Sequence, residues 1–263
     1  MNINDKIIFY FILYSFLGWC LESIYKSILQ KKTVNSGFLY GPFCPMYGIG
    51  AIIMIALSSI SKNVVVIFIL GFLVFSIWEY IVAVILEKLF KTKYWDYSNI
   101  KFNIKGRVCL KNSIYWGILG VLLIFVIQPL IERLTNLIPA DILRYIDIIL
   151  CIAIAIDAII TIFKIMVIDK KITEVFRLGE TIKEKLAELR KTENIEKSYK
   201  ENLQKIIDEL KMKQTNLKFK LYKRILRLKK SFPEMHSENI AKFMTQKISL
   251  DDLKKKIKEY KEK

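Results

Sequence analysis

The chain has 263 residues, of which 53% are hydrophobic and 25% are charged, and its formal net charge is +17. Its mean hydropathy of +0.32 is high for a chain with this much charge. Residues 1–168 hold only 15 of the 42 basic residues and 9 of the 25 acidic residues. This asymmetry excludes one uniform soluble domain, and it predicts a transmembrane domain over 1–168 followed by a basic helical cytoplasmic tail over 169–263.

Five apolar runs predict transmembrane helices, because about 20 apolar residues in a helix cross the hydrocarbon core of a bilayer. The predicted helices cover residues 7–29, 46–60, 64–90, 114–131 and 145–168. Ser113 is the expected N-cap of the fourth helix, and residues 132–144 form the expected loop before the fifth. The predicted fold class is therefore all-α: a polytopic protein of about five spans, with the lipid bilayer as its surroundings.

The segment between the first two helices reads TVNSGFLYGPFCPMYGIG, and its glycines and prolines make a regular helix improbable before about Met46. The segment is apolar nonetheless. Two interpretations stay open. It is either a re-entrant or interfacial loop, whose irregular backbone is satisfied by protein or lines a cavity, or a hydrophobic connector packed on the helix ends.

The segment between the third and fourth helices, residues 94–107, reads YWDYSNIKFNIKGR. A simple linker does not need aromatic residues around an acid, followed by two amides and an arginine. Arg107 is the natural partner of a nearby acid, because an unpaired buried charge is costly. We expect this loop to contribute to a polar site.

The basic residues of the short loops predict the orientation, since such residues are more frequent on the cytoplasmic side. With alternating sides, one face receives four basic residues and the other receives eight, in addition to the 27 of the tail. The N-terminus is therefore expected outside and the tail in the cytoplasm. Both unusual loops then share the cytoplasmic face.

The tail is compatible with helix from about residue 172 to 230, and its apolar residues recur in steps of four and three. This pattern predicts a coiled coil or an antiparallel helical hairpin. The expected seam consists of Ile182, Leu186, Leu189, Tyr199, Leu203, Ile206, Leu210, Leu217 and Leu221. The basic amphipathic stretch from Lys218 to Lys230 favours anionic lipid as a partner; no nucleic acid is expected. A short charged helix is expected at 249–263.

Acidic residues inside apolar runs are candidates for function, because each costs about 2.5–3.5 kcal/mol at the centre of a membrane helix. Glu79 and Asp157 lie deepest. Glu79 either serves a functional site or makes a structural hydrogen bond to a neighbouring helix. Asp157 is the weaker candidate for a functional site, because the sequence around it (IAIAIDAII) contains nothing else polar, and its alternative is to pair across helices. The predicted substrate-binding or structural polar cluster contains Glu22, Asn35, Glu79, Glu87, Trp95, Asp96, Asn103 and Arg107.

Signatures of metal sites and common enzymes are absent from the sequence. The four cysteines have no CxxC spacing, the single histidine lies in the tail, and GxxxxGK[ST], HExxH and GxSxG do not occur. We therefore expect no metal, no cofactor, no structural disulfide and no enzymatic activity.

Several motifs carry a resemblance to a known family: GWCLES from Gly18, VNSGFLYGPFCPMYGIG from Val34, WEY from Trp78 together with Glu87, YWDYS from Tyr94, and NIKGRVCLKNSIYWG from Asn103. Over about residues 7–140 the chain resembles a bacterial membrane family named ABC-transporter permease or ABC-transporter type IV, the CmpB-like group. The family usually has Asn-Arg-Gly where this chain has Asn-Ser-Gly at 35–37.

The resemblance implies a multi-pass protein of the bacterial cytoplasmic membrane, and a permease-like transport component that works with a separate ATPase subunit. An alternative is a membrane-anchored scaffold or sensor whose helical tail binds a cytosolic protein. A third hypothesis is an intramembrane enzyme that uses Asp96, Glu22 and Arg107.

Overall fold

A computed structural model describes residues 3–191, 197–245, 252, 253 and 255. The charged helix expected at 249–263 lies almost wholly outside these residues. The chain forms two compact units. We call Met1–Phe163 with Lys230–His236 the membrane unit, and Lys164–Lys229 with Ser237–Lys263 the hairpin unit.

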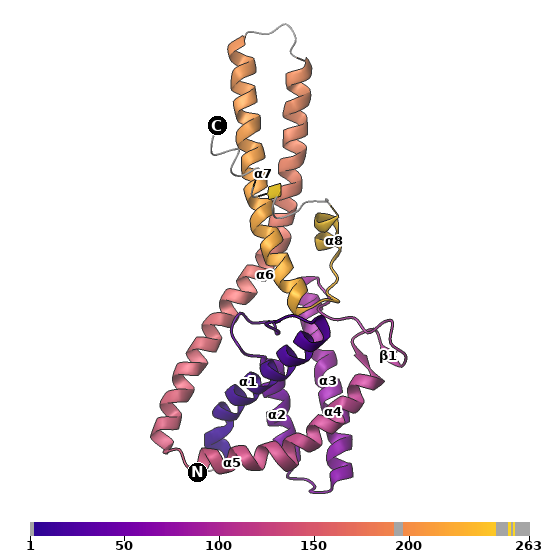
Figure 1. Ribbon diagram of the computed structural model, residues 1–263, viewed down its shortest axis with the longest axis vertical. Helices are drawn as coiled ribbons and strands as arrows, with labels where there is room; N and C mark the ends of the chain where they lie inside the picture. Colours follow the sequence, from indigo (N-terminus) through magenta and orange to yellow (C-terminus); the bar gives the residue numbers. More distant parts are fainter. Residues whose placement is uncertain (1–2, 192–196, 246–251, 254, 256–263) are drawn as a thin grey trace. The chain divides into compact units, whose positions relative to one another are not determined.

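The membrane unit is built almost entirely from helices, and α4, η1 and α5 follow one another as one continuous stretch (Figure 1). They are α1 (Ile3–Gln30), α2 (Pro45–Leu57), α3 (Val64–Phe90), α4 (Leu110–Leu122), the π-helix η1 (Leu123–Ile127), α5 (Gln128–Asn136) and the first part of α6 (Ala140–Lys191). Among the described residues, four stretches are long and apolar enough to cross a membrane: Lys6–Gln30, Val64–Phe90, Leu110–Asn136 and Ala140–Arg190. The prediction of an all-α, polytopic membrane protein is confirmed.

The second predicted span is the exception, because α2 has only 13 residues. At 1.5 Å per residue it is about 20 Å long, short of the roughly 30 Å hydrocarbon core. The irregular chain before it makes up part of the difference. The backbone N–H of Cys44 donates to the carbonyl of Ser15 over 2.9 Å, in the middle of α1. Irregular chain therefore reaches the interior of the helix bundle, where protein groups satisfy its backbone.

The fourth predicted span is longer than expected at both ends. It begins at Leu110, and Ser113 is not its N-cap but lies inside the helix, where its hydroxyl accepts a hydrogen bond from Ser76 over 2.7 Å. At the far end, Pro129 lacks an N–H and its ring crowds the carbonyl four residues earlier. The widened turn of η1 accommodates it. The helix thus continues to Asn136, and the loop expected at 132–144 shrinks to three residues.

Close packing of α3 and α4 depends on glycine. A Cβ added to Gly120 would lie 3.1 Å from the Cα of Gly71, and one added to Gly71 would lie 3.1 Å from the carbonyl oxygen of Trp116. Small residues let two membrane helices approach closely enough for extensive van der Waals contact. This contact fixes the side chains of α4 against those of α3.

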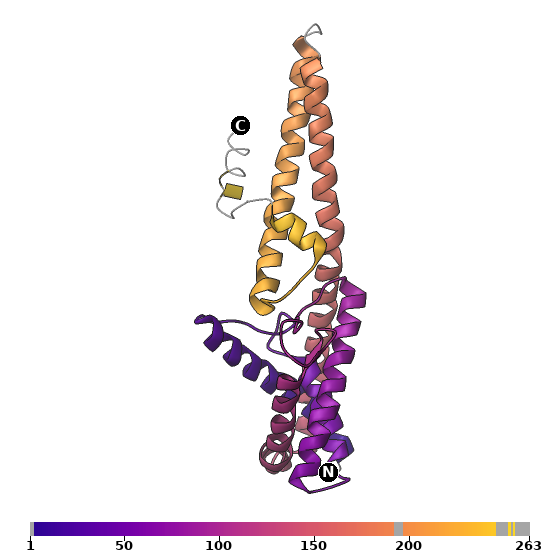
Figure 2. The ribbon, with the colours of Figure 1, turned by 90° about the vertical axis from the view of Figure 1, so that its right-hand side faces the viewer.

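The hairpin unit consists of the later part of α6, most of α7 (Lys197–Ser231) and the short α8 (Glu238–Met244). In this unit α6 and α7 lie side by side and antiparallel (Figures 1 and 2), with a hydrogen bond of 3.0 Å from the Gln214 amide to the carbonyl of Val175. Ile172, Val175, Leu203, Ile207, Leu221 and Ile225 are buried. The seam uses Ile207, whereas the predicted Ile206 is 40% exposed.

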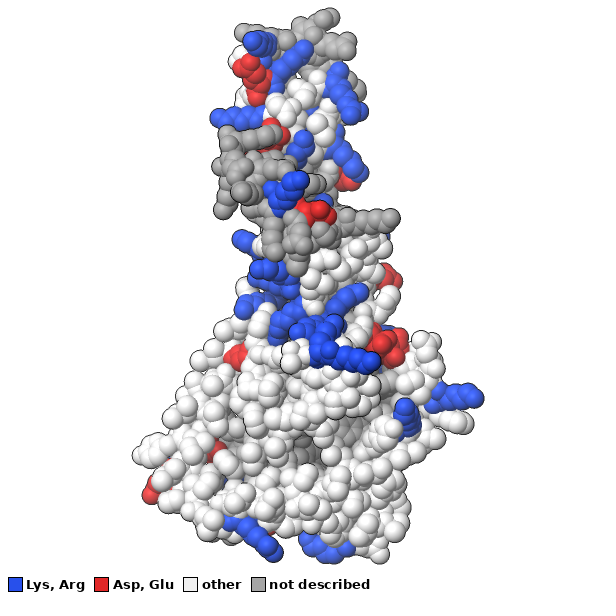
Figure 3. Space-filling model, viewed as in Figure 1, with Lys and Arg blue, Asp and Glu red and all other residues white. Residues whose placement is uncertain are grey.

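The two units differ in their surfaces. Figure 3 shows mostly uncharged atoms over the membrane unit and many Lys and Arg side chains over the hairpin helices. On the apolar part of α6, Ile149, Ile159 and Phe163 are more than 60% exposed. An apolar surface of this kind suits a lipid environment.

Candidate functional site

Glu79 of α3 is the most deeply buried carboxylate of the predicted cluster, with 4% of the residue exposed. Its oxygens accept hydrogen bonds from the amide of Asn112 over 2.9 and 3.0 Å, the indole N–H of Trp116 over 2.9 Å, and the hydroxyl of Tyr97 over 3.1 Å. Asn112 and Trp116 are one turn apart on α4, so both reach the same group. Burial, followed by the charge of Glu79, raises the pKa of Tyr97, which keeps its hydroxyl protonated.

A cavity of about 80 Å³ lies beside Glu79 in the membrane unit. Its wall is mostly hydrocarbon and aromatic ring, and Glu79 is its only charged residue. The aromatic residues are Tyr14, Tyr47, Phe75, Trp78 and Trp116. Since about 10–15 Å³ suffices for one water molecule, the cavity has room for a small ligand.

The loop between α3 and α4 carries a short β-hairpin, in which β1 (Asn103–Ile104) pairs with β2 (Val108–Cys109). Lys105 and Gly106 both have positive φ, of 53° and 71°, and the N–H of Arg107 donates to the carbonyl of Ile104 over 3.0 Å. These are features of a type I′ turn over residues 104–107, which favours glycine at its second central position. The turn places Arg107 directly before the second strand.

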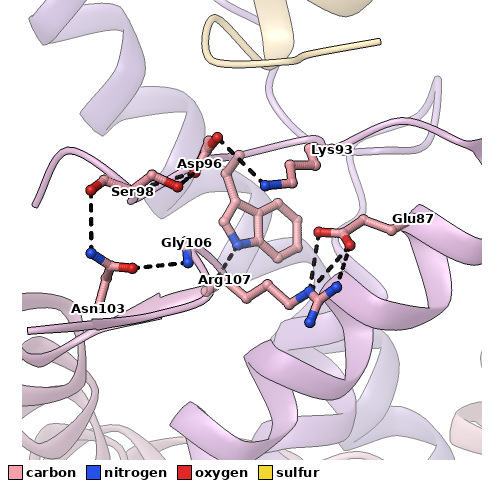
Figure 4. A network of polar contacts seen from close by, with 8 residues as sticks. Glu87, Lys93, Asp96, Ser98, Asn103, Gly106 and Arg107 are labelled. Carbon is pink, nitrogen blue, oxygen red and sulfur yellow. Dashed lines mark hydrogen bonds and ion pairs between the residues drawn. The ribbon is translucent and has the colours of Figure 1, made fainter. Parts of the chain in front are cut away.

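Arg107 pairs with Glu87 near the end of α3 (Figure 4). The closest contact, from a terminal guanidinium nitrogen to the carboxylate, is 2.6 Å, and Nε lies 3.2 Å from both oxygens. A further guanidinium N–H donates to the hydroxyl of Tyr80 over 2.9 Å. Glu87 raises the pKa of Arg107. The sequence predicted an acidic partner for Arg107, and the forked geometry makes its pair with Glu87 strong.

The rest of this loop is held together by its own polar side chains (Figure 4). Asp96 accepts hydrogen bonds from the N–H and the hydroxyl of Ser98, which lower the pKa of Asp96. The amide of Asn103 donates to the carbonyl of Ile100 over 2.8 Å and accepts from the N–H of Gly106 over 3.0 Å. The indole N–H of Trp95 donates to the carbonyl of Arg107 over 3.0 Å. These three predicted residues thus bond within the loop.

Glu22 and Asn35 have other partners. Glu22 forms an ion pair of 2.6 Å with Lys26 and accepts from the Cys44 thiol over 3.6 Å. The side chain of Asn35 accepts from the indole N–H of Trp19 over 2.7 Å.

Asp157 of α6 holds the irregular segment before α2. One oxygen accepts from the N–H of Gly41 over 2.7 Å, and the other accepts from the N–H of Tyr40 over 3.2 Å. The sequence predicted a partner on another helix, but the partners are backbone N–H groups of a loop. The hydroxyl of Thr161, one turn further along α6, also donates to Asp157 over 3.2 Å. The residues on either side of Asp157 in the sequence are apolar, and they gave no sign of the contact with the loop.

The segment 230–236 returns to the membrane unit and lies against both unusual loops. Ser231 donates to the carbonyl of Asn35 over 2.8 Å, the ring of Phe232 packs on that of Tyr94 at 5.0 Å, and His236 pairs its backbone with Lys93. The two loops also touch directly, since the rings of Phe38 and Tyr94 are 5.6 Å apart. Sequence reasoning missed this segment, because it looked like a simple end of the helical tail.

The comparison with protein families shows to which family the chain belongs. Residues 9–162 match the family described as "Putative ABC-transporter type IV", which is more than half of the sequence. The chain belongs to this family. No curated protein and no solved structure matches the chain.

The type IV ABC-transporter match includes every residue of the predicted cluster and the cavity, but not the hairpin unit. Within the matched range, the motif that begins at Gly18 packs against the motif that contains Tyr47. The contact is close, because a Cβ added to Gly18 would lie 2.3 Å from the side chain of Tyr47. The motifs at Glu79 and Trp116 meet through a hydrogen bond. The family match thus covers the part of the chain that builds the buried carboxylate and its cavity.

The predicted cluster forms several separate groups of contacts. Glu87, Trp95 and Arg107 are linked with each other, while Asp96 and Asn103 brace the same loop. Glu79 has its own set of donors, to which Tyr97 and Asn112 belong. Both residues lie in motifs of the resemblance, which was the available signal for them. Within the described ranges, no group of three His, Cys, Asp or Glu could hold a metal ion.

Proposed function

We propose that this chain is a permease-like component of a transport system in a bacterial cytoplasmic membrane, and that a separate ATPase subunit drives it. One observation carries the proposal: a buried carboxylate, Glu79, lies at the wall of a cavity inside a bundle of membrane helices. Ionisable groups at such depth commonly mark the path or site of a solute. The role is non-enzymatic, with the cavity as substrate site and the Arg107 loop as its support.

Reconstitution tests the proposal. Liposomes that contain the chain and a copurifying ATPase should take up solute in an ATP-dependent manner, and Glu79→Gln should reduce uptake at least tenfold. Glu234→Gln is the matched control, because Glu234 is exposed and does not line the cavity. Uptake that is unchanged in Glu79→Gln, or the failure of any ATPase to copurify, contradicts the proposal.

A second candidate function is a membrane-anchored scaffold, in which the helical tail binds a cytosolic protein. The contacts of segment 230–236 with both loops favour it, since they tie the end of α7 to the membrane unit. Removing residues 180–212 and joining the ends with a short linker shortens the hairpin and retains this segment. Loss of the cellular role with intact uptake supports the scaffold, and the reverse result supports transport.

Anionic lipid is a proposed partner of the stretch from Lys218 to Lys230. Its apolar residues Leu221, Ile225 and Leu228 are buried within the hairpin unit. Its attraction to lipid would therefore rest on charge, about 1 kcal/mol for each basic residue close to the surface. Binding to vesicles that contain anionic lipid should weaken with added salt and vanish on neutral vesicles.

A further inference from the structure

The cavity beside Glu79 restricts the class of ligand by its charge. Glu79 is a carboxylate, and no Lys or Arg forms an ion pair with it in the part of the chain that the structure describes. The N–H groups of Asn112 and Trp116 can only donate, so both oxygens of Glu79 act as acceptors toward them, and these hydrogen bonds favour the ionised carboxylate. An uncompensated negative charge at the wall excludes anionic solutes and favours a cation.

Hydrogen bonding restricts the ligand further. An ionised carboxylate offers about four acceptor positions, and four donor contacts already reach the oxygens of Glu79. Two further polar groups of the wall have protein partners: the indole of Trp78 donates to the carbonyl of Met46 over 2.9 Å, and the hydroxyl of Tyr14 donates to Gln128. A ligand with several hydrogen-bonding groups would lose its hydrogen bonds to water on entering the cavity, and it would find few free partners there.

Aromatic rings form much of the cavity wall and further restrict the class of ligand. Tyr14, Tyr47, Phe75, Trp78 and Trp116 line the cavity, and the ring of Trp116 lies 5.3 Å from that of Phe75 and 5.5 Å from that of Tyr47. Aromatic rings attract cations through their quadrupole, and cages of such rings recognise quaternary ammonium groups. A metal ion is unsuited to this wall, because hard cations require oxygen ligands.

We propose that the cavity binds a compact quaternary ammonium cation, held by the field of Glu79 and by the surrounding aromatic rings. Such a cation carries charge without hydrogen-bond donors, so the saturated oxygens of Glu79 are no obstacle. The volume of about 80 Å³ limits the group in the cavity to a small one with methyl substituents. This inference rests on the proposed function only in taking the cavity as the substrate site.

Titration calorimetry of the purified full-length chain in detergent, with tetramethylammonium chloride as the probe, tests the inference. We expect saturable binding, with ammonium chloride and the neutral neopentyl alcohol each at least tenfold weaker. Glu79→Gln should weaken tetramethylammonium binding at least tenfold, while the exposed control Glu234→Gln should leave it unchanged. Equal binding of the neutral alcohol, or no saturable binding of the cation, overturns the inference.

A second variant covers the case in which Glu79→Gln does not fold. Phe75→Leu keeps an apolar side chain of similar size and removes one ring of the wall, so tetramethylammonium binding should weaken several-fold. An unchanged affinity in a folded Phe75→Leu protein contradicts the role of the rings. Because equilibrium binding needs no ATPase, binding without uptake would overturn transport alone, and uptake without tetramethylammonium binding would overturn the ligand class alone.

Discussion

Arg107 and Glu87 illustrate how single residues hold the loop between α3 and α4. Both side chains are about one-fifth exposed, and they share three contacts of 2.6–3.2 Å. A half-buried, forked pair of this kind is stronger than a surface ion pair, since its charges are partly shielded from water. The pair connects the turn of the β-hairpin with the end of a membrane helix.

A double-mutant cycle measures this pair. Glu87→Gln and Arg107→Gln should each lower the free energy of unfolding by about 1–3 kcal/mol, because each leaves a charged hydrogen-bonding partner without its counterpart. The double variant should lose less than the sum of the two. Unfolding in detergent, followed by circular dichroism, gives the three values. Strict additivity would show that the two side chains do not interact in solution.

The pH dependence of stability tests the Asp96–Ser98 contact. Hydrogen bonds from Ser98 lower the pKa of Asp96 below its ordinary 3.8. A depressed pKa stabilises the folded state at pH values above 3.8, and this contribution is lost as the pH falls through the folded pKa. The difference in unfolding midpoint between wild type and Ser98→Ala should therefore be constant from pH 7 to about 5 and shrink below 3.8. Ser59→Ala, at the other end of the membrane unit, should show no such trend.

At the scale of elements, the apolar runs predicted most of the helices well, and α3 begins and ends at the predicted residues. The polar N-cap Asn63 and the charged residues after Phe90 mark its ends clearly. The short α2 and the continuation of α4 through η1 were not predictable in the same way. Both depend on packing against other helices. Such packing stabilises α2 although it is short, and it stabilises η1 although Pro129 has no N–H to donate.

The candidate site was predictable in part. The sequence singled out Glu79, Glu87 and Arg107, since charges in or beside apolar runs need partners. It did not indicate that Tyr97 and Asn112 would saturate Glu79, or that Asp157 would bind the backbone of Gly41. Those contacts join segments far apart in the chain, so their geometry is decided by the tertiary fold.

The β-hairpin should be sensitive to its turn glycine. A Cβ added to Gly106 would lie 2.3 Å from an oxygen of Asp96, and the positive φ disfavours any other residue. Gly106→Ala should therefore displace the turn and speed trypsin cleavage after the neighbouring Lys105 at least several-fold. Ile104→Ala, an exposed position of the same hairpin, is the control. Equal cleavage of both variants would mean that the turn tolerates the methyl group.

The contact of α3 with α4 should be equally sensitive to added bulk. Gly120→Val places a branched side chain where the Cα of Gly71 lies 3.1 Å from a Cβ, so the helices must separate and Asn112 and Trp116 must move away from Glu79. We expect a lower yield of folded protein and a fall of several degrees in its unfolding temperature. Leu122→Val, at a position 45% exposed on the same helix, should behave like wild type. A stable Gly120→Val protein would contradict the close packing.

At the scale of the whole molecule, the family match ends at residue 162, close to the end of the main part of the membrane unit at Phe163. The chain leaves that unit through α6 and returns to it at Lys230. The hairpin unit is thus an addition to the family's membrane part, connected to it at three points of the chain: 163/164, 229/230 and 236/237. This connection allows the hairpin to serve a role of its own while the segment 230–236 stays with the membrane unit.

The orientation of the membrane unit across the bilayer is predicted from the basic residues of its loops. Its basic loops favour an external turn at 61–63 and an internal loop at 91–109, and these two lie at opposite ends of α3. With Cys20 and Cys151 replaced by Ser, a membrane-impermeant maleimide should label Lys62→Cys in intact cells. It should label Phe102→Cys, at a position 78% exposed, only after permeabilisation. The opposite pattern would place the hairpin unit outside the cell, where an ATPase or any other cytosolic partner could not reach it.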